Sequence, residues 1–237
     1  MSRHREVVST GNEELDTRLG GGIPVPSLII VEGDHGTGKS VFVQQIAYGF
    51  LKSGLVVYYI TTESTVKELL LQSKRVSLDM TSYFLKGKLK VFPVHIEGAK
   101  WAKNIARILL QIVSRFMTNT VNDWNLFILD SFTVLAVYAN ISAVLNFLTV
   151  ARNLVAQDKV ILLAIHPGAL SDDIMIRARS ICDGYIRLRI YEVGGMILKA
   201  MEVVKLRGAL GPVDSIIAFD VDPAFGIKIL PLSLAKA

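Results

Sequence analysis

The stretch Ser27-Leu-Ile-Ile-Val-Glu-Gly-Asp-His-Gly-Thr-Gly-Lys-Ser40 decides how the remaining sequence is interpreted. Residues 27–32 are mostly apolar and predict a short buried strand. Three glycines fall within positions 33–38, and apolar side chains at helical spacing then run from Lys39 to Lys52, before Gly54. The sequence therefore predicts a strand, a glycine-rich loop and a helix in direct succession.

The loop at 33–40 matches the pattern G-x-x-x-x-G-K-[ST] at every defined position. Glycines allow a tight turn and a close approach to a ligand, while inward N–H groups and the positive end of the following helix attract anions. A glycine-rich turn that carries a lysine by chance is the alternative, but the flanking strand and helix favour a phosphate site. We predict that the phosphate-binding residues are Gly33, Asp34, His35, Gly36, Thr37, Gly38, Lys39 and Ser40, with Mg²⁺ on the Ser40 hydroxyl.

Segments of two periodicities alternate beyond the loop. Strand patterns at 55–61, 89–94, 126–129 and 160–165 are separated by helical patterns at 64–76, with Ser64 as the N-cap, 102–117 and 142–157. This alternation indicates parallel βαβ units. After Ser180, extended runs at 185–191, 196–206, 215–220 and 226–231 predict antiparallel hairpins at the sheet edge. The expected fold is one α/β domain over residues 1–237, with a mainly parallel central sheet flanked by helices.

The composition predicts a cytoplasmic protein without disulfides or membrane spans. The chain has 237 residues, 51% of them hydrophobic, which suffices for one large core or at most two small ones. No apolar run approaches the roughly 18 residues that a membrane span requires, and the first residues lack a signal-peptide pattern. The single cysteine, Cys182, fits a reducing compartment. The net charge of +5 comes from scattered basic residues, which favours a solvated surface over a nucleic-acid patch.

Two acidic residues follow predicted strands and are expected near the loop. Asp130 comes directly after the apolar run 126–129, where phosphate-loop proteins place an acidic group that holds Mg²⁺ directly or through water. Its alternative role is to cap the following segment. Glu63 follows the strand 55–61, at the sheet edge where it could polarise an attacking water. The alternative for Glu63 is a solvated residue in the first turn of the next helix.

His166 ends the strand 160–165 and precedes Pro167. In this place its ring could sense a γ-phosphate through a hydrogen bond. A histidine satisfied by the local backbone of a turn explains the position equally well, so both interpretations stay open.

These motifs together resemble the KaiC-like branch of the RecA superfamily. The resemblance extends from about Ser9 to Leu230 and is carried by runs 9–16 and 19–24, the phosphate loop, Thr62-Glu63-Ser64, Leu129-Asp130-Ser131 and Lys205-Leu206-Arg207-Gly208. Within that branch, runs 164–168, 176–184 and 222–231 look similar to the ATP-binding proteins of the archaeal flagellum, or archaellum.

The resemblance implies ATP as the nucleotide and a protein at the cytoplasmic face of an archaeal membrane. It also implies two partners, the motor ATPase FlaI and the scaffold FlaX, with membrane association only through such partners. A homo-oligomeric ring is implied as well, for which a hexamer is one candidate, although the residues do not give the number of subunits.

One position departs from the KaiC pattern. KaiC domains carry two adjacent glutamates where this chain has Thr62 and Glu63, and the first of them is the family's usual base. A threonine cannot accept a proton from water at neutral pH, and a general base contributes typically 10²–10⁴-fold to a rate. The resemblance therefore implies ATP binding with slow or absent hydrolysis.

Lys205 and Arg207 are two residues apart at the end of the predicted strand 196–206, so we expect both to point to one side. In ring-forming relatives this segment faces the γ-phosphate of the neighbouring subunit, where a cation supplied in trans stabilises charge. The alternative is a pair of solvated charges on an edge strand, where such charges deter aggregation.

The sequence leaves three classes of function open. The first is an ATP-dependent assembly module with little turnover, which Thr62 favours. The second is an active ATPase or a kinase that phosphorylates itself, because hydroxyls near the expected γ-phosphate come from Thr61, Thr62, Ser64 and Thr65. The third is a DNA-binding RecA relative, which would need basic or aromatic loops. For this third class the chain offers only the run 93–101, with His95, Lys100 and Trp101.

Overall fold

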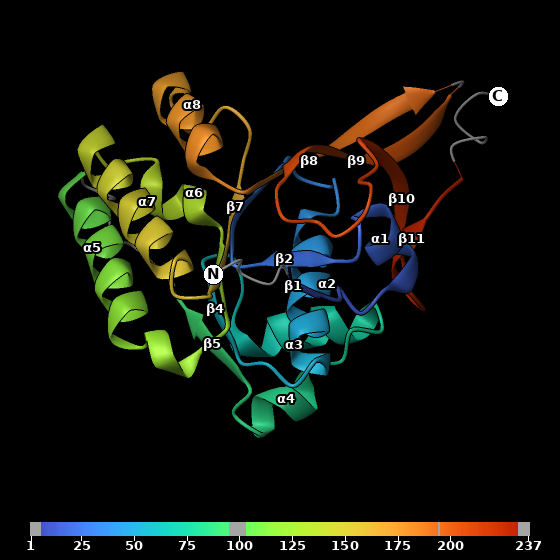
Figure 1. The fold of residues 1–237 in the computed structure, drawn as a ribbon, viewed down its shortest axis with the longest axis horizontal. Coiled ribbons are helices and arrows are strands. Elements are labelled where there is room, and N and C mark those ends of the chain that lie inside the picture. The colour runs from blue at the N-terminus through green and yellow to red at the C-terminus, as the bar shows by residue number, and fades with distance from the viewer. Residues whose placement is uncertain (1–5, 95–102, 194, 232–237) are drawn as a thin grey trace.

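Nine strands form one mostly parallel sheet in the computed structural model, which describes residues 6–94, 103–193 and 195–231 (Figure 1). The order along the chain is β1 (Glu6–Val8), α1 (Glu13–Arg18), β2 (Ile23–Val25), β3 (Ser27–Gly33), α2 (Lys39–Lys52), β4 (Val57–Thr61), α3 (Val66–Arg75), α4 (Thr81–Leu85), β5 (Leu89–Pro93), α5 (Lys103–Asn119), the 3-10 turn η1 (Val121–Asp123), β6 (Leu126–Asp130), α6 (Phe132–Ala136), α7 (Ile141–Val155), β7 (Val160–Ile165), α8 (Asp172–Ile181), β8 (Gly184–Val193), β9 (Met196–Leu206), β10 (Ile216–Asp222) and β11 (Gly226–Ile229).

The strand order across the sheet is β11-β10-β9-β8-β3-β7-β6-β4-β5. The strands from β8 to β5 in this order pair in parallel, whereas β8–β9, β9–β10 and β10–β11 are antiparallel pairs. The predicted α/β fold with a mainly parallel sheet is therefore confirmed.

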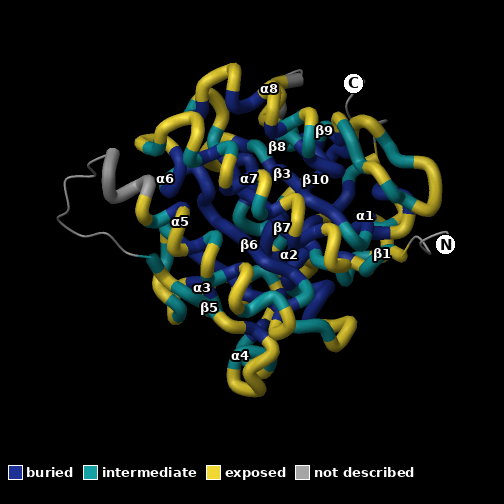
Figure 2. Tube along the Cα trace, turned by 60° about the vertical axis from the view of Figure 1, so that its left-hand side comes forward, coloured by how far each residue is buried: buried dark blue, intermediate teal, exposed yellow. Residues whose placement is uncertain are grey.

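Helices cover both faces of the sheet (Figure 1). On one face α2 packs with α1 and α3 around Phe42, Ile46 and Phe50, and on the other α5 to α8 pack around Phe132 and Phe147. All residues of β4 and β6 are buried, as expected for parallel strands covered on both faces, and the tube in Figure 2 shows this buried centre. Among the described helices, none has both the length and the apolar character needed to cross a bilayer.

The predicted antiparallel hairpin of run 185–191 with run 196–206 is confirmed by the β8–β9 pair. The sequence did not predict that β8 also pairs in parallel with β3, from Ile29 opposite Gly184 to Gly33 opposite Leu188. The crossover that permits this parallel pairing is α8, which was not predicted as a helix from the sequence. The strands from β9 to β11 are antiparallel, as predicted.

The start of α3 also differs from the prediction. Its N-cap is Thr65 rather than Ser64, because the Thr65 hydroxyl accepts the N–H of Glu68 while the Glu68 carboxylate accepts the N–H of Thr65. The Ser64 hydroxyl instead lies 3.1 Å from that of Thr61. Five short elements were not predicted, because with six residues or fewer they are too short to show a period: β1, β2, α1, α4 and α6.

The N-terminal segment forms its own two-stranded sheet, β1 with β2, and then ties two distant elements together. Gln45 of α2 donates to the carbonyl oxygen of Thr10 at 2.9 Å. Asn12 donates to the carbonyl oxygen of Ile227 in β11 at 2.6 Å. The chain around Ser9 and Thr10 runs so close to α2 that a Cβ atom on Gly49 would lie 2.2 Å from the Ser9 carbonyl oxygen.

This contact predicts an unusual response to Gly49→Ala. In an exposed helix alanine is better than glycine by about 1 kcal/mol, but here the added methyl would meet backbone. We expect a net loss of roughly 1–3 kcal/mol in the free energy of unfolding, measured in denaturant. Lys52→Ala at the exposed end of the same helix is the control and should change it by less than about 0.5 kcal/mol. A Gly49→Ala protein as stable as the wild type would contradict the prediction.

Candidate nucleotide-binding site

The loop at 33–40 connects the end of β3 to the start of α2, as predicted. Gly36 and Gly38 have φ angles of 78° and 87°, a region that residues with a side chain rarely adopt. At Gly33 the constraint is space, because a Cβ atom would lie 2.8 Å from the Thr37 hydroxyl oxygen. That hydroxyl donates to the carbonyl oxygen of Asp34 at 2.7 Å, which closes the loop on itself.

A cavity of about 320 Å³ opens beside the loop and brings together predicted residues from three parts of the chain, although Asp130 is not among its lining residues. The side chains of Lys39, Ser40, Glu63 and His166 line it, as do loop residues 34–36 and 38. Two lining residues, Lys199 of β9 and Val221 of β10, were not predicted. No local signal marks them, because their place beside the loop follows from the pairing of β9 with β8 and of β10 with β9.

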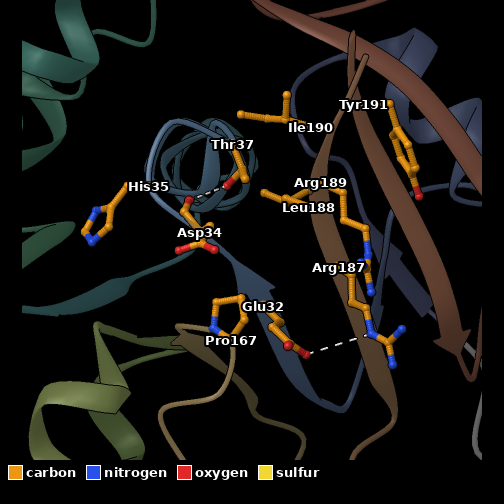
Figure 3. Close-up of a pocket in the computed structure, with 10 residues that line it drawn as sticks. All are labelled: Glu32, Asp34, His35, Thr37, Pro167, Arg187, Leu188, Arg189, Ile190 and Tyr191. Atoms are coloured by element: carbon orange, nitrogen blue, oxygen red, sulfur yellow. Dashed lines mark hydrogen bonds and ion pairs between the residues drawn. The ribbon is translucent and has the colours of Figure 1, made fainter. Parts of the chain in front are cut away.

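A second cavity, of about 490 Å³, lies between the loop and β8 (Figure 3). In it Arg187 lies 3.9 Å from the carboxylate of Glu32, the residue just before the loop. This cavity contains neither Lys39 nor Ser40. The smaller cavity is therefore the candidate phosphate site, because Lys39 and Ser40 line it.

Lys39 is a nearly buried cation at the start of α2. Its ammonium donates to the carbonyl oxygen of Ile165 at 3.3 Å. Burial lowers the pKa of Lys39, while the nearby carboxylates of Asp130, Glu63 and Asp34 act in the opposite direction. An anionic ligand would relieve the cost of this buried charge, as a phosphate-binding lysine requires.

Asp130 ends β6 with one carboxylate oxygen bound and the other unpaired. The Tyr59 hydroxyl donates to Oδ2 at 2.6 Å, whereas Oδ1 is buried and has no hydrogen-bond partner among the described residues. The capping alternative is wrong, because Ser131 is the N-cap of α6 and Asp130 bonds to Tyr59 instead. An unpaired, buried carboxylate oxygen suits Mg²⁺ or one of its waters, so Asp130 fits the metal role predicted for it together with Ser40.

In the absence of a ligand, ionisation of the Asp130 carboxyl group is energetically unfavourable. Burial raises the pKa of Asp130, and the Glu63 carboxylate raises it further, while the Tyr59 hydrogen bond and the Lys39 ammonium lower it. Burial and the neighbouring Asp130 likewise hold the pKa of Tyr59 well above its usual value, so its hydroxyl stays a donor.

His166 and Glu63 lie together at the edge of the cavity. The Glu63 carboxylate is 3.9 Å from His166 Nε2, and its side chain is 43% exposed. His166 Nδ1 lies 3.4 Å from the Ser131 hydroxyl, and the His166 ring stacks at an angle against that of His35. The ring of His166 thus contacts other elements rather than its own turn. Burial and Lys39 lower the pKa of His166, so the ring is neutral at pH 7.

Thr62 occupies the position of the missing glutamate and has a structural role. Its hydroxyl accepts the N–H of Ser131 at 3.1 Å, and its own N–H donates to the carbonyl oxygen of Asp130 at 2.9 Å. Thr62 therefore anchors the end of β6 and offers no carboxylate to activate water.

Lys205 and Arg207 lie at the opposite end of the sheet from the loop. Leu206 pairs with Gly184 and Met201 with Leu188, and Leu188 in turn pairs with Gly33. The Lys205 ammonium donates to the last carbonyl oxygens of α8, at 3.0 Å for Arg179 and 3.3 Å for Ser180. β9 is an inner strand, so the edge-strand alternative is wrong, and neither cation can serve the loop of its own chain.

A parallel sheet in which β3 runs into a glycine-rich loop and then α2 defines a RecA-like P-loop nucleotide-binding fold. The family model of KaiC ATPases matches residues 8–233. The archaeal flagellar ATP-binding protein FlaH of Sulfolobus acidocaldarius is 40% identical over 231 residues, 98% of this chain and 100% of that protein. The chain therefore belongs to the KaiC family of ATPases and, within it, to the FlaH proteins.

Solved structures agree with this assignment. The flagellar accessory protein FlaH of Methanocaldococcus jannaschii matches with a TM-score of 0.82 at 28% identity, covering 96% of this chain and 98% of that one. A KaiC-like protein of Pyrococcus horikoshii matches with a TM-score of 0.74 at 21% identity, covering 96% of this chain and all of that one, and so supports the fold alone.

The buried carboxylate predicts that Asp130→Asn stabilises the ligand-free protein at neutral pH. Because the pKa of Asp130 is raised in the folded state, its contribution to stability is present below the ordinary carboxyl pKa of 3.8 and is lost as the pH rises. Asparagine removes this loss and can still accept from Tyr59. We expect a gain of about 1 kcal/mol, or roughly 2–4 °C in Tm at pH 7, which shrinks toward pH 4. A lower Tm for the variant at pH 7 would contradict the prediction.

Proposed function

We propose that this chain binds ATP with Mg²⁺ and uses the bound nucleotide to assemble an archaellum motor complex, with little or no hydrolysis. The printed names of its relatives, archaeal flagellar ATP-binding proteins, support the nucleotide and the setting. The observation that carries the low turnover is Thr62, whose hydroxyl is engaged with Ser131 at the position where a base is needed.

The proposed site uses each residue for a separate task. The loop N–H groups and Lys39 would bind the phosphates, and Ser40 and Asp130 would hold Mg²⁺, which when bound would supply positive charge that offsets the charge of the phosphates. Glu63 lies near the γ-phosphate position as a weak base at most. His166, between Glu63 and Ser131, is the sensor that would exchange one of these contacts for the γ-phosphate.

Assembly is proposed at two levels. In a homo-oligomeric ring, for which a hexamer is one candidate, Lys205 and Arg207 of one subunit would serve the loop of the next, and their distance from their own loop supports this. The ring would meet the motor ATPase FlaI and the scaffold FlaX at the cytoplasmic face of the membrane. Family membership supports these partners, and contact with the membrane would come only through them.

The two other classes of function have less support. Among the hydroxyls considered for self-phosphorylation, Thr61 and Ser64 contact each other, Thr62 accepts from Ser131, and Thr65 caps α3, so each already has a structural contact. The run 93–101 considered for DNA binding lies, from position 95 onward, outside the described residues. A single-stranded DNA mobility shift that rises at low salt would favour the DNA class.

The assembly proposal predicts that Lys39→Ala abolishes nucleotide-dependent capture of FlaI. Loss of a charge-assisted contact to phosphate should weaken ATP binding about 10- to 100-fold, measured by calorimetry with Mg²⁺. In a pull-down with ATP, wild type should retain FlaI and Lys39→Ala should not. Lys52→Ala, at the exposed end of the same helix, is the matched control and should behave as wild type. Equal capture by wild type and Lys39→Ala, with ATP bound only by wild type, would refute a nucleotide-dependent assembly role.

Installing a carboxylate at the vacant position should increase turnover. Thr62→Glu is expected to raise phosphate release by up to about 10²-fold, although loss of the hydrogen bond to Ser131 costs about 1 kcal/mol of stability. Thr62→Val removes the same hydrogen bond without adding a base and should stay at the wild-type rate. If Thr62→Glu binds ATP but releases phosphate no faster than Thr62→Val, the absence of a base is not what limits turnover.

A further inference from the structure

Tyr59 is a fully buried tyrosine whose only polar atom is directed at the metal site. It lies in β4 on the face covered by α2, the same face to which Leu126, Ile128 and Asp130 of the neighbouring strand β6 belong. Its hydroxyl donates to Asp130 Oδ2 at 2.6 Å. The ring is part of the core around α2, so a phenylalanine could fill the same volume.

The effect of this hydrogen bond is to separate the two oxygens of Asp130. Oδ2 is held by Tyr59, which prevents the carboxylate from rotating and leaves Oδ1 as the oxygen that can bind a ligand. Oδ1 is buried and has no partner among the described residues. A buried acceptor without a partner is rare in proteins, and an ion or water bound at Oδ1 is the explanation that fits a carboxylate near Lys39 and the loop.

The hydroxyl of Tyr58, the preceding residue, has a different hydrogen-bond partner. Tyr58 is directed to the opposite face of the sheet, where it belongs to the core around α5 to α8. Its hydroxyl accepts from the ammonium of Lys90 at 2.9 Å, away from Asp130. The two adjacent tyrosines therefore offer the same chemical change, removal of one hydroxyl, at the metal site and away from it.

We propose that Tyr59 is a positioning residue that orients Asp130 and thereby sets how strongly the site binds Mg²⁺. This inference rests on the proposed ATP–Mg²⁺ function. Residues that orient a metal ligand through a hydrogen bond typically change metal affinity 10- to 100-fold when removed. A purely structural role for the hydroxyl would change the stability of the protein and leave its Mg²⁺ dependence unaltered.

The test compares Tyr59→Phe with Tyr58→Phe. A fluorescent ATP analogue at fixed concentration is titrated with Mg²⁺, and its affinity is also measured in EDTA. For Tyr59→Phe we expect the Mg²⁺ concentration at half-saturation to rise roughly 10- to 100-fold, with the affinity in EDTA unchanged. Tyr58→Phe should match wild type in both measurements. In an Asp130→Asn background, Tyr59→Phe should add no further change to the Mg²⁺ response.

Three results would overturn the inference. One is an unchanged Mg²⁺ midpoint for Tyr59→Phe, and another is an equal loss of affinity with Mg²⁺ and in EDTA, which would indicate general damage. The third is a Tyr59→Phe effect that persists in full in Asp130→Asn. A wild-type protein that binds no ATP analogue would instead overturn the proposed function, and this inference with it.

Discussion

The candidate site depends on the alignment of four parallel strands, because their ends supply its residues at one level. Glu32 of β3 pairs with Ile165 of β7, and Thr61 of β4 pairs with Asp130 of β6. The loop, His166, Asp130 and Glu63 therefore follow neighbouring strand ends and meet, although they lie far apart in the sequence. A slip of one residue in any of these pairings would turn the affected side chains to the opposite face of the sheet.

The same alignment confines opposite charges to a region with little water. Lys39 and Asp130 are both nearly buried. Burial lowers the pKa of Lys39 and raises the pKa of Asp130, and both shifts favour the neutral form of the side chain. The attraction between the two charges offsets part of the free-energy cost of burying them. Their side chains do not form a direct ion pair, so part of this cost remains. A bound nucleotide would bring negative phosphates to Lys39 and a cation to Asp130. Its binding would therefore stabilise the fold as well as fill the site. The site is thus less stable alone than a core of the same size, a common compromise in functional proteins.

Much of the fold was predictable from the sequence because its signals are local. α2 and β7 have the predicted boundaries, since the glycine-rich loop, Gly54 and the apolar run 160–165 mark them directly. The parallel pairing of β8 with β3 was not predictable in this way, because it depends on the crossover through α8 and on which strand β8 meets in space, and no short stretch of sequence contains this information. Lys199, Val221 and Tyr59 were missed for a related reason. Their place at the site follows from strand pairing and side-chain direction, which no short stretch of sequence contains.

The hydrogen bond from Asn12 to Ile227 joins residues 215 positions apart. During synthesis Asn12 leaves the ribosome long before its partner Ile227 in β11 has been made. The contact between the N-terminal segment and β11 can therefore form only after residue 227 has left the ribosome, and until then this side of α2 lacks its contact with β11. A nascent chain stalled before β11 would carry a complete phosphate-binding loop on a helix that still lacks its final cover.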